Sequence, residues 1–126
     1  MQRVLVLEDD EDLRFILCEL LLLAGVEACV ATGSVEELQR RQDEALGCEL
    51  AILDINLGAA VPSGLEAYRW LRGRGFGGRI VFLSGHAHSH PLVCQAHALS
   101  DVQVLAKPVD SQTLLALLGS CADGTG

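Results

Sequence analysis

Short apolar runs alternate with longer segments of helical periodicity along the whole chain, and this alternation restricts the fold more than any other feature. The runs occupy residues 4–7, 26–31, 50–53, 79–83 and 102–106. Short continuous apolar runs are typical of strands buried on both faces of a sheet. Strands that alternate with helices form a parallel sheet with right-handed crossovers and helices on both faces. The sequence therefore predicts an α/β fold of the (βα)5 type, a doubly wound five-stranded parallel sheet.

Start and stop signals for helices lie between these runs. Apolar residues recur at helical spacing from residue 13 to residue 24, and Gly25 follows as a C-terminal cap. The other signals are two S-x-x-E capping boxes, a proline suited to a first helical turn and an aspartate suited to an N-cap: Ser34 with Glu37, Ser63 with Glu66, Pro91 and Asp110. We expect five helices, the last of which runs through Leu118.

Length and charge limit the classes of function. A chain of 126 residues suits one compact domain; we expect this domain to span residues 1–121 and to be followed by a flexible tail or linker end at 122–126. A formal charge of −8 argues against direct contact with nucleic acid, because phosphate backbones require a basic surface. The longest apolar stretch, residues 15–26, contains Glu19 and is too short for a bilayer of roughly 30 Å. No secretory signal precedes the first strand, so we expect a cytoplasmic protein without membrane insertion.

The five cysteines are widely spaced and form no CxxC pair: Cys18, Cys29, Cys48, Cys94 and Cys121. An odd number at such spacings fits neither a disulfide framework nor a zinc knuckle. We expect them to be reduced and mostly buried, as free cysteines commonly are. The alternative is a redox-sensing thiol.

Polar residues follow four of the predicted strands. Glu8 and Asp9 come after the first strand, Asp54 after the third, Ser84 after the fourth and Lys107 after the fifth. In open parallel sheets the active crevice lies at the carboxyl ends of the strands. We therefore expect three acids, a hydroxyl group and an ammonium group to meet at one edge of the sheet.

This combination of groups indicates a particular chemistry. Clustered carboxylates repel one another, and a hard divalent cation such as Mg²⁺ relieves that repulsion. A carboxylate beside Mg²⁺ can attack phosphorus to give an acyl phosphate if the charge on the transferring oxygens is neutralised. Lys107 and Ser84 are suitable for that neutralisation. The alternative for the acidic run 8–12 is a solvated helix start, where carboxylates favour the helix dipole.

The chain resembles a response-regulator receiver domain of two-component signal transduction from end to end. Four segments carry the resemblance, in order and at the right spacing: VLVLEDDEDLR, LAILDINL, IVFLSG and VLAKP. The resemblance implies the flavodoxin-like receiver fold and Mg²⁺-dependent transfer of a phosphoryl group to Asp54 from a histidine kinase or a phosphotransfer protein. It implies a conformational switch as the output, a homodimer as a further candidate assembly, and catalysis of the chain's own phosphorylation and dephosphorylation only.

The resemblance also assigns roles to individual residues. In the family the acid pair lies five residues before an arginine like Arg14, which selects Glu8 and Asp9 over Asp10. Asp9 and Asp54 are then direct metal ligands, Glu8 acts through water, and the backbone carbonyl of Asn56 is a further ligand. His86, two residues after Ser84, is expected to tune how fast water reaches the acyl phosphate. An H-x-H-x-H series, His86, His88 and His90, could also bind a transition metal, but no fourth ligand is marked and a solvated loop is the favoured interpretation.

Departures from the family pattern concern the loops and the switch. Gly58 stands where the family usually has proline, and the following glycine is Gly64, two residues later than usual, so the loop 58–62 is lengthened. Ser84 replaces the commoner threonine, and the small Gly85 after it should leave the site open. Val104 stands where the family has an aromatic switch residue.

Two further hypotheses stay open. The first is a receiver-like docking or dimerisation module that is insensitive to phosphorylation because its switch is altered. The second is an aspartyl-phosphate phosphatase of the haloacid dehalogenase kind, which would need D-x-D, whereas Asn56 lies two residues after Asp54.

Overall fold

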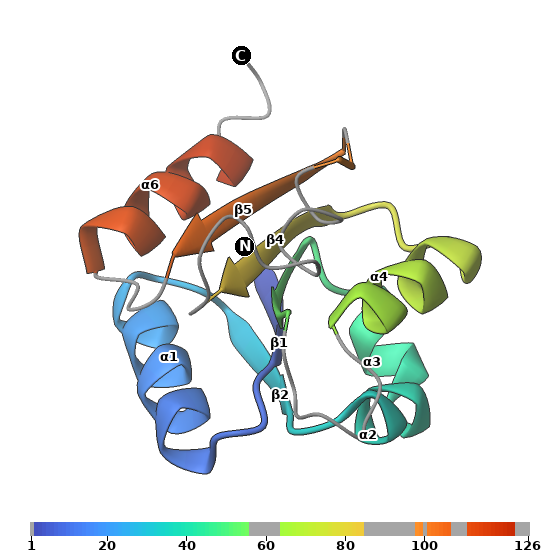
Figure 1. Ribbon diagram of the computed structural model, residues 1–126. Helices are drawn as coiled ribbons and strands as arrows, with labels where there is room; N and C mark the ends of the chain where they lie inside the picture. The colour runs from blue at the N-terminus through green and yellow to red at the C-terminus, as the bar shows by residue number, and fades with distance from the viewer. Residues whose placement is uncertain (1, 56–63, 85–97, 100, 107–110, 123–126) are drawn as a thin grey trace.

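The computed structural model describes residues 2–55, 64–84, 98–99, 101–106 and 111–122 (Figure 1). Along these segments strands alternate with helices. The elements are β1 (Arg3–Leu7), α1 (Glu11–Leu23), β2 (Ala28–Thr32), α2 (Val35–Arg40), α3 (Gln42–Leu46), β3 (Leu50–Asp54), α4 (Gly64–Gly73), β4 (Arg79–Ser84), β5 (Val102–Ala106) and α6 (Ser111–Ala122). No helix in these segments is long and apolar enough to cross a membrane.

The strands form one five-stranded sheet in the order β2-β1-β3-β4-β5. Every neighbouring pair is parallel, so the carboxyl ends of all five strands meet at one edge. This is the doubly wound order of flavodoxin-like folds, which confirms the predicted fold class. β3 lies at the centre of the sheet, and all five of its residues are buried.

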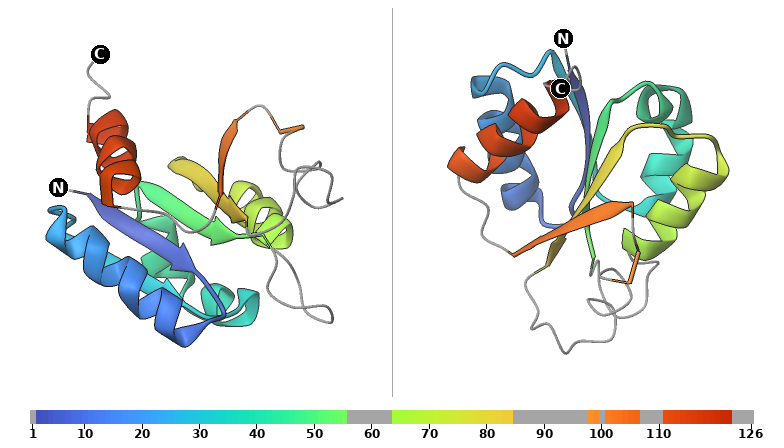
Figure 2. Two further views of the ribbon diagram at one scale, coloured as in Figure 1. Left: turned by 60° about the vertical axis from the view of Figure 1, so that its left-hand side comes forward. Right: turned by 90° about the horizontal axis from the view of Figure 1, so that it is seen from above.

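Helices cover both faces of the sheet (Figure 2). α1 and α6 pack on one face over a core that includes Leu21, Ile52 and Leu114. α2, α3 and α4 pack on the other face over a core that includes Leu38 and Phe82. The strands carry apolar side chains on both faces for this reason, which explains their continuous apolar runs.

The C-terminus of α1 shows why β2 starts two residues later than predicted. Gly25 adopts a φ of 102°, a conformation that glycine accepts readily. Its N–H donates to the carbonyl of Leu22, and the N–H of Val26 donates to that of Leu21. This is the Schellman motif, so Gly25 does cap the helix as predicted. Val26 belongs to the cap, and the strand begins only at Ala28.

The segment after β2 forms two short helices where a single one was predicted. Ser34 caps α2 by accepting a hydrogen bond from the N–H of Glu37 at 3.1 Å, as the capping box indicates. The helix is then interrupted at Arg41, whose Nη1 donates to the carbonyl of Ala31 at 2.8 Å. The predicted start signals at Ser63, Pro91 and Asp110 lie outside the described residues.

Candidate functional site

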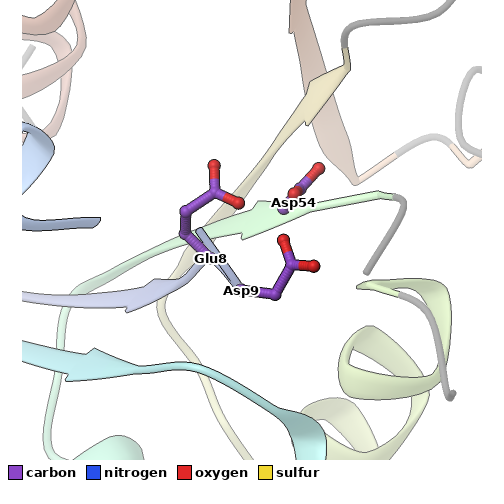
Figure 3. A group of neighbouring side chains, drawn as sticks. All are labelled: Glu8, Asp9 and Asp54. Atoms are coloured by element: carbon purple, nitrogen blue, oxygen red, sulfur yellow. The ribbon is translucent and has the colours of Figure 1, made fainter. Parts of the chain in front are cut away.

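Three carboxyl groups gather at the edge where the strands end (Figure 3). Glu8 and Asp9 follow β1 directly, and Asp54 is the last residue of β3. One carboxylate oxygen from each lies within 4.8 Å of the others. Glu8 and Asp54 are 3% and 4% exposed, whereas Asp9 faces solvent. The group is therefore open to solvent on the side of Asp9 and enclosed on the side of Asp54.

The backbone at Glu8 is fixed by neighbouring elements. Its N–H donates to the carbonyl of Thr32 at the end of β2, at 3.0 Å. Its carbonyl accepts a hydrogen bond from Nη1 of Arg14 at 2.8 Å. Thr32 is fully buried, and its hydroxyl donates to the carbonyl of Val6 at 2.8 Å. These bonds hold the β1–α1 connection in the position that directs Glu8 and Asp9 towards Asp54.

Asp10, the next acid in the sequence, caps helix α1. Its side chain accepts hydrogen bonds from the N–H groups of Asp12 and Leu13 at the start of α1. It is the N-cap of that helix, where a carboxylate satisfies free N–H groups and interacts favourably with the helix dipole. The acidic run thus divides by function, because Asp10 starts the helix while Glu8 and Asp9 join the carboxylate group.

The backbone at Asp54 is approached closely by Gly64 at the start of α4. The N–H of Gly64 donates to the carbonyl of Ile55 at 3.0 Å. A Cβ atom on Gly64 would lie 2.2 Å from the carbonyl oxygen of Asp54, far inside contact distance. Only glycine permits this approach, so Gly64 sets how α4 meets the strand that carries Asp54.

Ser84 ends the neighbouring strand and is also buried, at 5% exposure. β4 pairs with β3 so that Leu83 lies opposite Asp54, and Ser84 follows one residue further along. Lys107, Asn56, His86, His88, His90, Gly58 and Gly85 lie outside the described residues. Of the predicted site residues, the described ones are Glu8, Asp9, Asp54 and Ser84, and all four lie at one edge of the sheet.

The donor set favours a hard divalent cation. Two buried carboxylates and an exposed one, with oxygen atoms within 4.8 Å of one another, repel one another unless a proton or a cation intervenes. Mg²⁺ prefers carboxylate oxygens together with water, which the open side at Asp9 can provide. The residues present therefore fit the metal that the sequence implies.

The supporting contacts of the site do not follow from the sequence pattern. Arg14 served only as a marker of spacing, and its bond to the carbonyl of Glu8 depends on how α1 folds back over β1. Thr32 was not singled out, although a threonine at the end of a buried strand is a signal for a side chain that bonds the neighbouring backbone.

Comparison with known proteins agrees with this geometry. The family model of the response regulator receiver domain matches residues 4–119. The chain therefore belongs to the response regulator receiver family of two-component signalling. A search of curated proteins gave no match.

Solved structures show the same fold at low sequence identity. A receiver domain protein from Clostridium thermocellum aligns with a TM-score of 0.80 and 20% identity, over 99% of this chain and 97% of that one. A CheY-like receiver domain from Methylobacillus flagellatus aligns with a TM-score of 0.77 and 24% identity, over 96% of this chain and 98% of that one. The receiver domain of NtrX from Brucella abortus aligns with a TM-score of 0.78 and 22% identity, over 96% of this chain and 98% of that one.

Proposed function

We propose that Asp54 accepts a phosphoryl group from a phosphohistidine of a histidine kinase or phosphotransfer protein, and that the chain signals by a change of conformation. The observation that carries this proposal is the carboxylate group of Glu8, Asp9 and Asp54 at the strand ends of a receiver-family chain. The proposed domain spans residues 1–121 and is followed by a tail at 122–126, into which α6 extends by one residue, and its proposed location is the cytoplasm.

Each carboxylate has its own role in the proposed reaction. A carboxylate oxygen of Asp54 attacks phosphorus while the histidine nitrogen departs, which leaves an acyl phosphate. Asp9 and Asp54 would hold Mg²⁺ directly, Glu8 would act through water, and the backbone carbonyl of Asn56 would be a further ligand. The bound metal would offset the negative charge of the phosphoryl oxygens. The burial of Asp54 would limit the access of bulk water to its acyl phosphate.

The strand ends beside Asp54 supply the remaining groups. Ser84 is proposed to donate a hydrogen bond from its hydroxyl group to a phosphoryl oxygen, since it ends the strand next to β3. Lys107 follows β5 directly in the sequence and is proposed to pair with a second phosphoryl oxygen. His86, two residues after Ser84, is proposed to tune the rate of hydrolysis. The chain acts only on itself in this scheme, so it is not an enzyme with a separate substrate.

Mg²⁺-dependent labelling tests the proposal. The protein is incubated with acetyl phosphate, with or without Mg²⁺, and the acyl phosphate is reduced with borohydride and located by mass spectrometry. We expect modification at Asp54 that requires Mg²⁺ and disappears in Asp54→Asn. Asp10→Asn is the matched control, because asparagine retains the N-cap and removes an acid outside the group. Label that persists undiminished in Asp54→Asn would contradict the site.

The alternative is a receiver-like docking or dimerisation module that does not respond to phosphate. Val104, in place of an aromatic switch residue, is the observation that favours it. Absence of label on the wild-type protein, with intact Mg²⁺ binding, would support this alternative.

A further inference from the structure

Two cysteines from different elements lie against each other on the α1 side of the sheet. Cys18 belongs to α1 and Cys29 to β2, eleven residues further along the chain. Their Sγ atoms are 2.9 Å apart. Both are free thiols and both are partly exposed. Figure 1 shows α1 lying alongside β2, which is an edge strand of the sheet.

The distance between the sulfur atoms is short enough for a covalent bond to form with little movement. A disulfide bond is about 2.0 Å long, so the Sγ atoms need to approach by about 0.9 Å. Rotation of two side chains on the protein surface can supply that change. The backbones of α1 and β2 already pack against each other.

Hydrogen bonding makes the two thiols chemically unequal. The S–H of Cys29 donates to Cys18, and this bond lowers the pKa of Cys18. Burial and the carboxylate of Glu19 act in the opposite direction, whereas the guanidinium of Arg14, one turn earlier on α1, lowers the pKa further. The same hydrogen bond, together with burial, raises the pKa of Cys29. Cys18 is therefore the sulfur that becomes the thiolate, and the thiolate is the reactive form of cysteine.

Small oxidants can reach Cys18 from solvent. The residue lines a surface pocket of about 690 Å³ together with Arg14, Phe15, Ile16 and Ala31. Hydrogen peroxide is far smaller than this pocket. Cys18 is thus accessible from this pocket, and the Sγ of Cys29 lies 2.9 Å from its own Sγ.

We propose that Cys18 and Cys29 form a reversible disulfide bond on exposure to a peroxide. The Cys18 thiolate attacks one peroxide oxygen, breaks the O–O bond and becomes a sulfenic acid, and the departing hydroxide takes up a proton to give water. The sulfur of Cys29 then attacks the Cys18 sulfur, its proton joins the departing hydroxide, and a second water leaves. In sum, two thiols and one hydrogen peroxide give one disulfide and two waters. A dithiol reductant returns the disulfide to two thiols by exchange.

The crosslink would join two elements that support the β1–α1 connection. Arg14 of α1 donates a hydrogen bond to the carbonyl of Glu8. The N–H of Glu8 in turn donates to the carbonyl of Thr32 in β2. The proposal does not depend on phosphorylation of Asp54, since it rests on the cysteine pair alone.

Cys48 provides an internal control. It is 5% exposed, its Sγ donates to the carbonyl of Glu44 at 3.4 Å, and burial raises its pKa to about 11. A buried neutral thiol should not react with peroxide. Cys94 and the side chain of Cys121 lie outside the described residues, so the experiment has to separate them from the pair by peptide.

The sequence allows that separation. Trypsin cleaves after Arg14 and Arg40 and finds no lysine or arginine between them, so peptide 15–40 contains Cys18 and Cys29 and no other cysteine. The protein is treated with hydrogen peroxide, unfolded, alkylated with iodoacetamide and digested. We expect peptide 15–40 to lose about 2 Da and take up no alkyl group, and to take up two alkyl groups after reduction with dithiothreitol. The peptide with Cys48 should stay fully alkylated throughout.

Variants establish which sulfur reacts first. In Cys29→Ser the sulfenic acid should persist on Cys18 and be trapped by dimedone, whereas Cys18→Ser should give no dimedone adduct on Cys29. Cys48→Ser should form the 18–29 disulfide like the wild type. Two alkyl groups on peptide 15–40 after oxidation of the wild-type protein would overturn the proposal, as would a dimedone adduct confined to Cys29. The wild-type measurement is decisive even if a variant fails to fold.

Discussion

At the scale of single residues, the acid group and its glycine neighbour determine what the site tolerates. Glu8 and Asp54 are buried with like charge close by, and Asp9 completes the group at the surface. Gly64 comes so close to the backbone of Asp54 that no other residue fits. Repulsion among the carboxylates and the close approach of Gly64 therefore both act at Asp54.

Mg²⁺ should stabilise the fold, because it relieves repulsion that only the folded state imposes on these carboxylates. A ligand that binds only the folded state at about 100 times its Kd contributes about 2.7 kcal/mol to the free energy of unfolding. Thermal unfolding over a Mg²⁺ titration should thus show a rising Tm in the wild type and in Asp10→Asn. Asp54→Asn should show a much smaller rise. A wild-type Tm that is constant from zero to saturating Mg²⁺ would contradict the metal site.

Gly64→Ala should destabilise the protein by about 2–3 kcal/mol, because the new Cβ forces α4 or β3 to shift. It should also slow labelling of Asp54. Gly73→Ala is a matched control at the other end of α4, where a Cβ meets nothing within 4 Å. We expect the control to be neutral or slightly stabilising, as alanine favours helix over glycine. Urea denaturation of both variants provides the test, and equal free energies of unfolding would refute the close approach.

At the scale of elements, α4 is joined to the segment before β5 by a polar cluster. Tyr68 donates a hydrogen bond to Oδ1 of Asp101 at 2.7 Å, and Nε of Arg72 donates to Oδ2 at 3.0 Å. Nη1 of Arg72 also donates to the carbonyls of Phe76 and Gly78. The cluster therefore holds the chain in place just before β5, an edge strand that pairs with β4.

The cluster should give a small contribution to stability that depends on pH. The hydrogen bond from Tyr68 lowers the pKa of Asp101, with a further contribution from Arg72. A lowered pKa in the folded state stabilises the protein above the unfolded value of about 3.9, and this contribution is lost as the pH falls through the folded pKa. Because the Asp101 side chain is 45% exposed, we expect Asp101→Asn to cost under about 1 kcal/mol at pH 7.

Chemical denaturation between about pH 7 and pH 3 tests the direction of this pH dependence. The difference in free energy of unfolding between the wild type and Asp101→Asn should become smaller as the pH falls. Glu66→Gln removes a more exposed ion pair to Arg69 on the same helix and serves as the control. A difference that widens towards low pH would contradict the prediction.

The elements also show how far the sequence determines the fold. The ends of β3 and β5 were predicted to within one residue, because buried strands between helices leave a clear apolar run. The start of β2 was wrong by two residues, since Val26 is apolar but takes part in the helix cap. The break between α2 and α3 falls at Arg41, whose side chain bonds the carbonyl of Ala31 ten residues earlier, a contact that the local sequence pattern does not predict. The meeting of Glu8, Asp9 and Asp54 follows from parallel strand ends, whereas the approach of Gly64 depends on a distance that no local pattern encodes.

At the scale of the whole molecule, Val104 bears on how a signal would leave the site. It pairs with Phe82 across β4 and β5 and is partly buried against the core. Valine is short and stiff at its first side-chain torsion, so it cannot sweep the volume of an aromatic ring. A ligand shifts an equilibrium only through differential interaction with the two states. We therefore expect activation to change mainly the loops 84–90 and 58–62.

Amide chemical shifts with and without beryllofluoride and Mg²⁺ test this expectation. The largest changes should fall in those two loops. Val104→Tyr restores a ring and should extend the changes to β5 and α6. Large shifts centred on Val104 and α6 in the wild type, with both loops unchanged, would show the expectation to be wrong.

The central position of β3 has a consequence for hydrogen exchange. Its five residues are buried and it is bonded on both sides, so its amides should exchange with deuterium only when the domain unfolds globally. The edge strands β2 and β5 should exchange through smaller, more frequent openings. Asp54 is therefore expected to lie on the strand that opens last, whereas Cys29 and Val104 lie on edge strands that should open more readily. Chemistry at Asp54 would leave its own strand unmoved, and any response would have to travel outwards to the edges of the sheet.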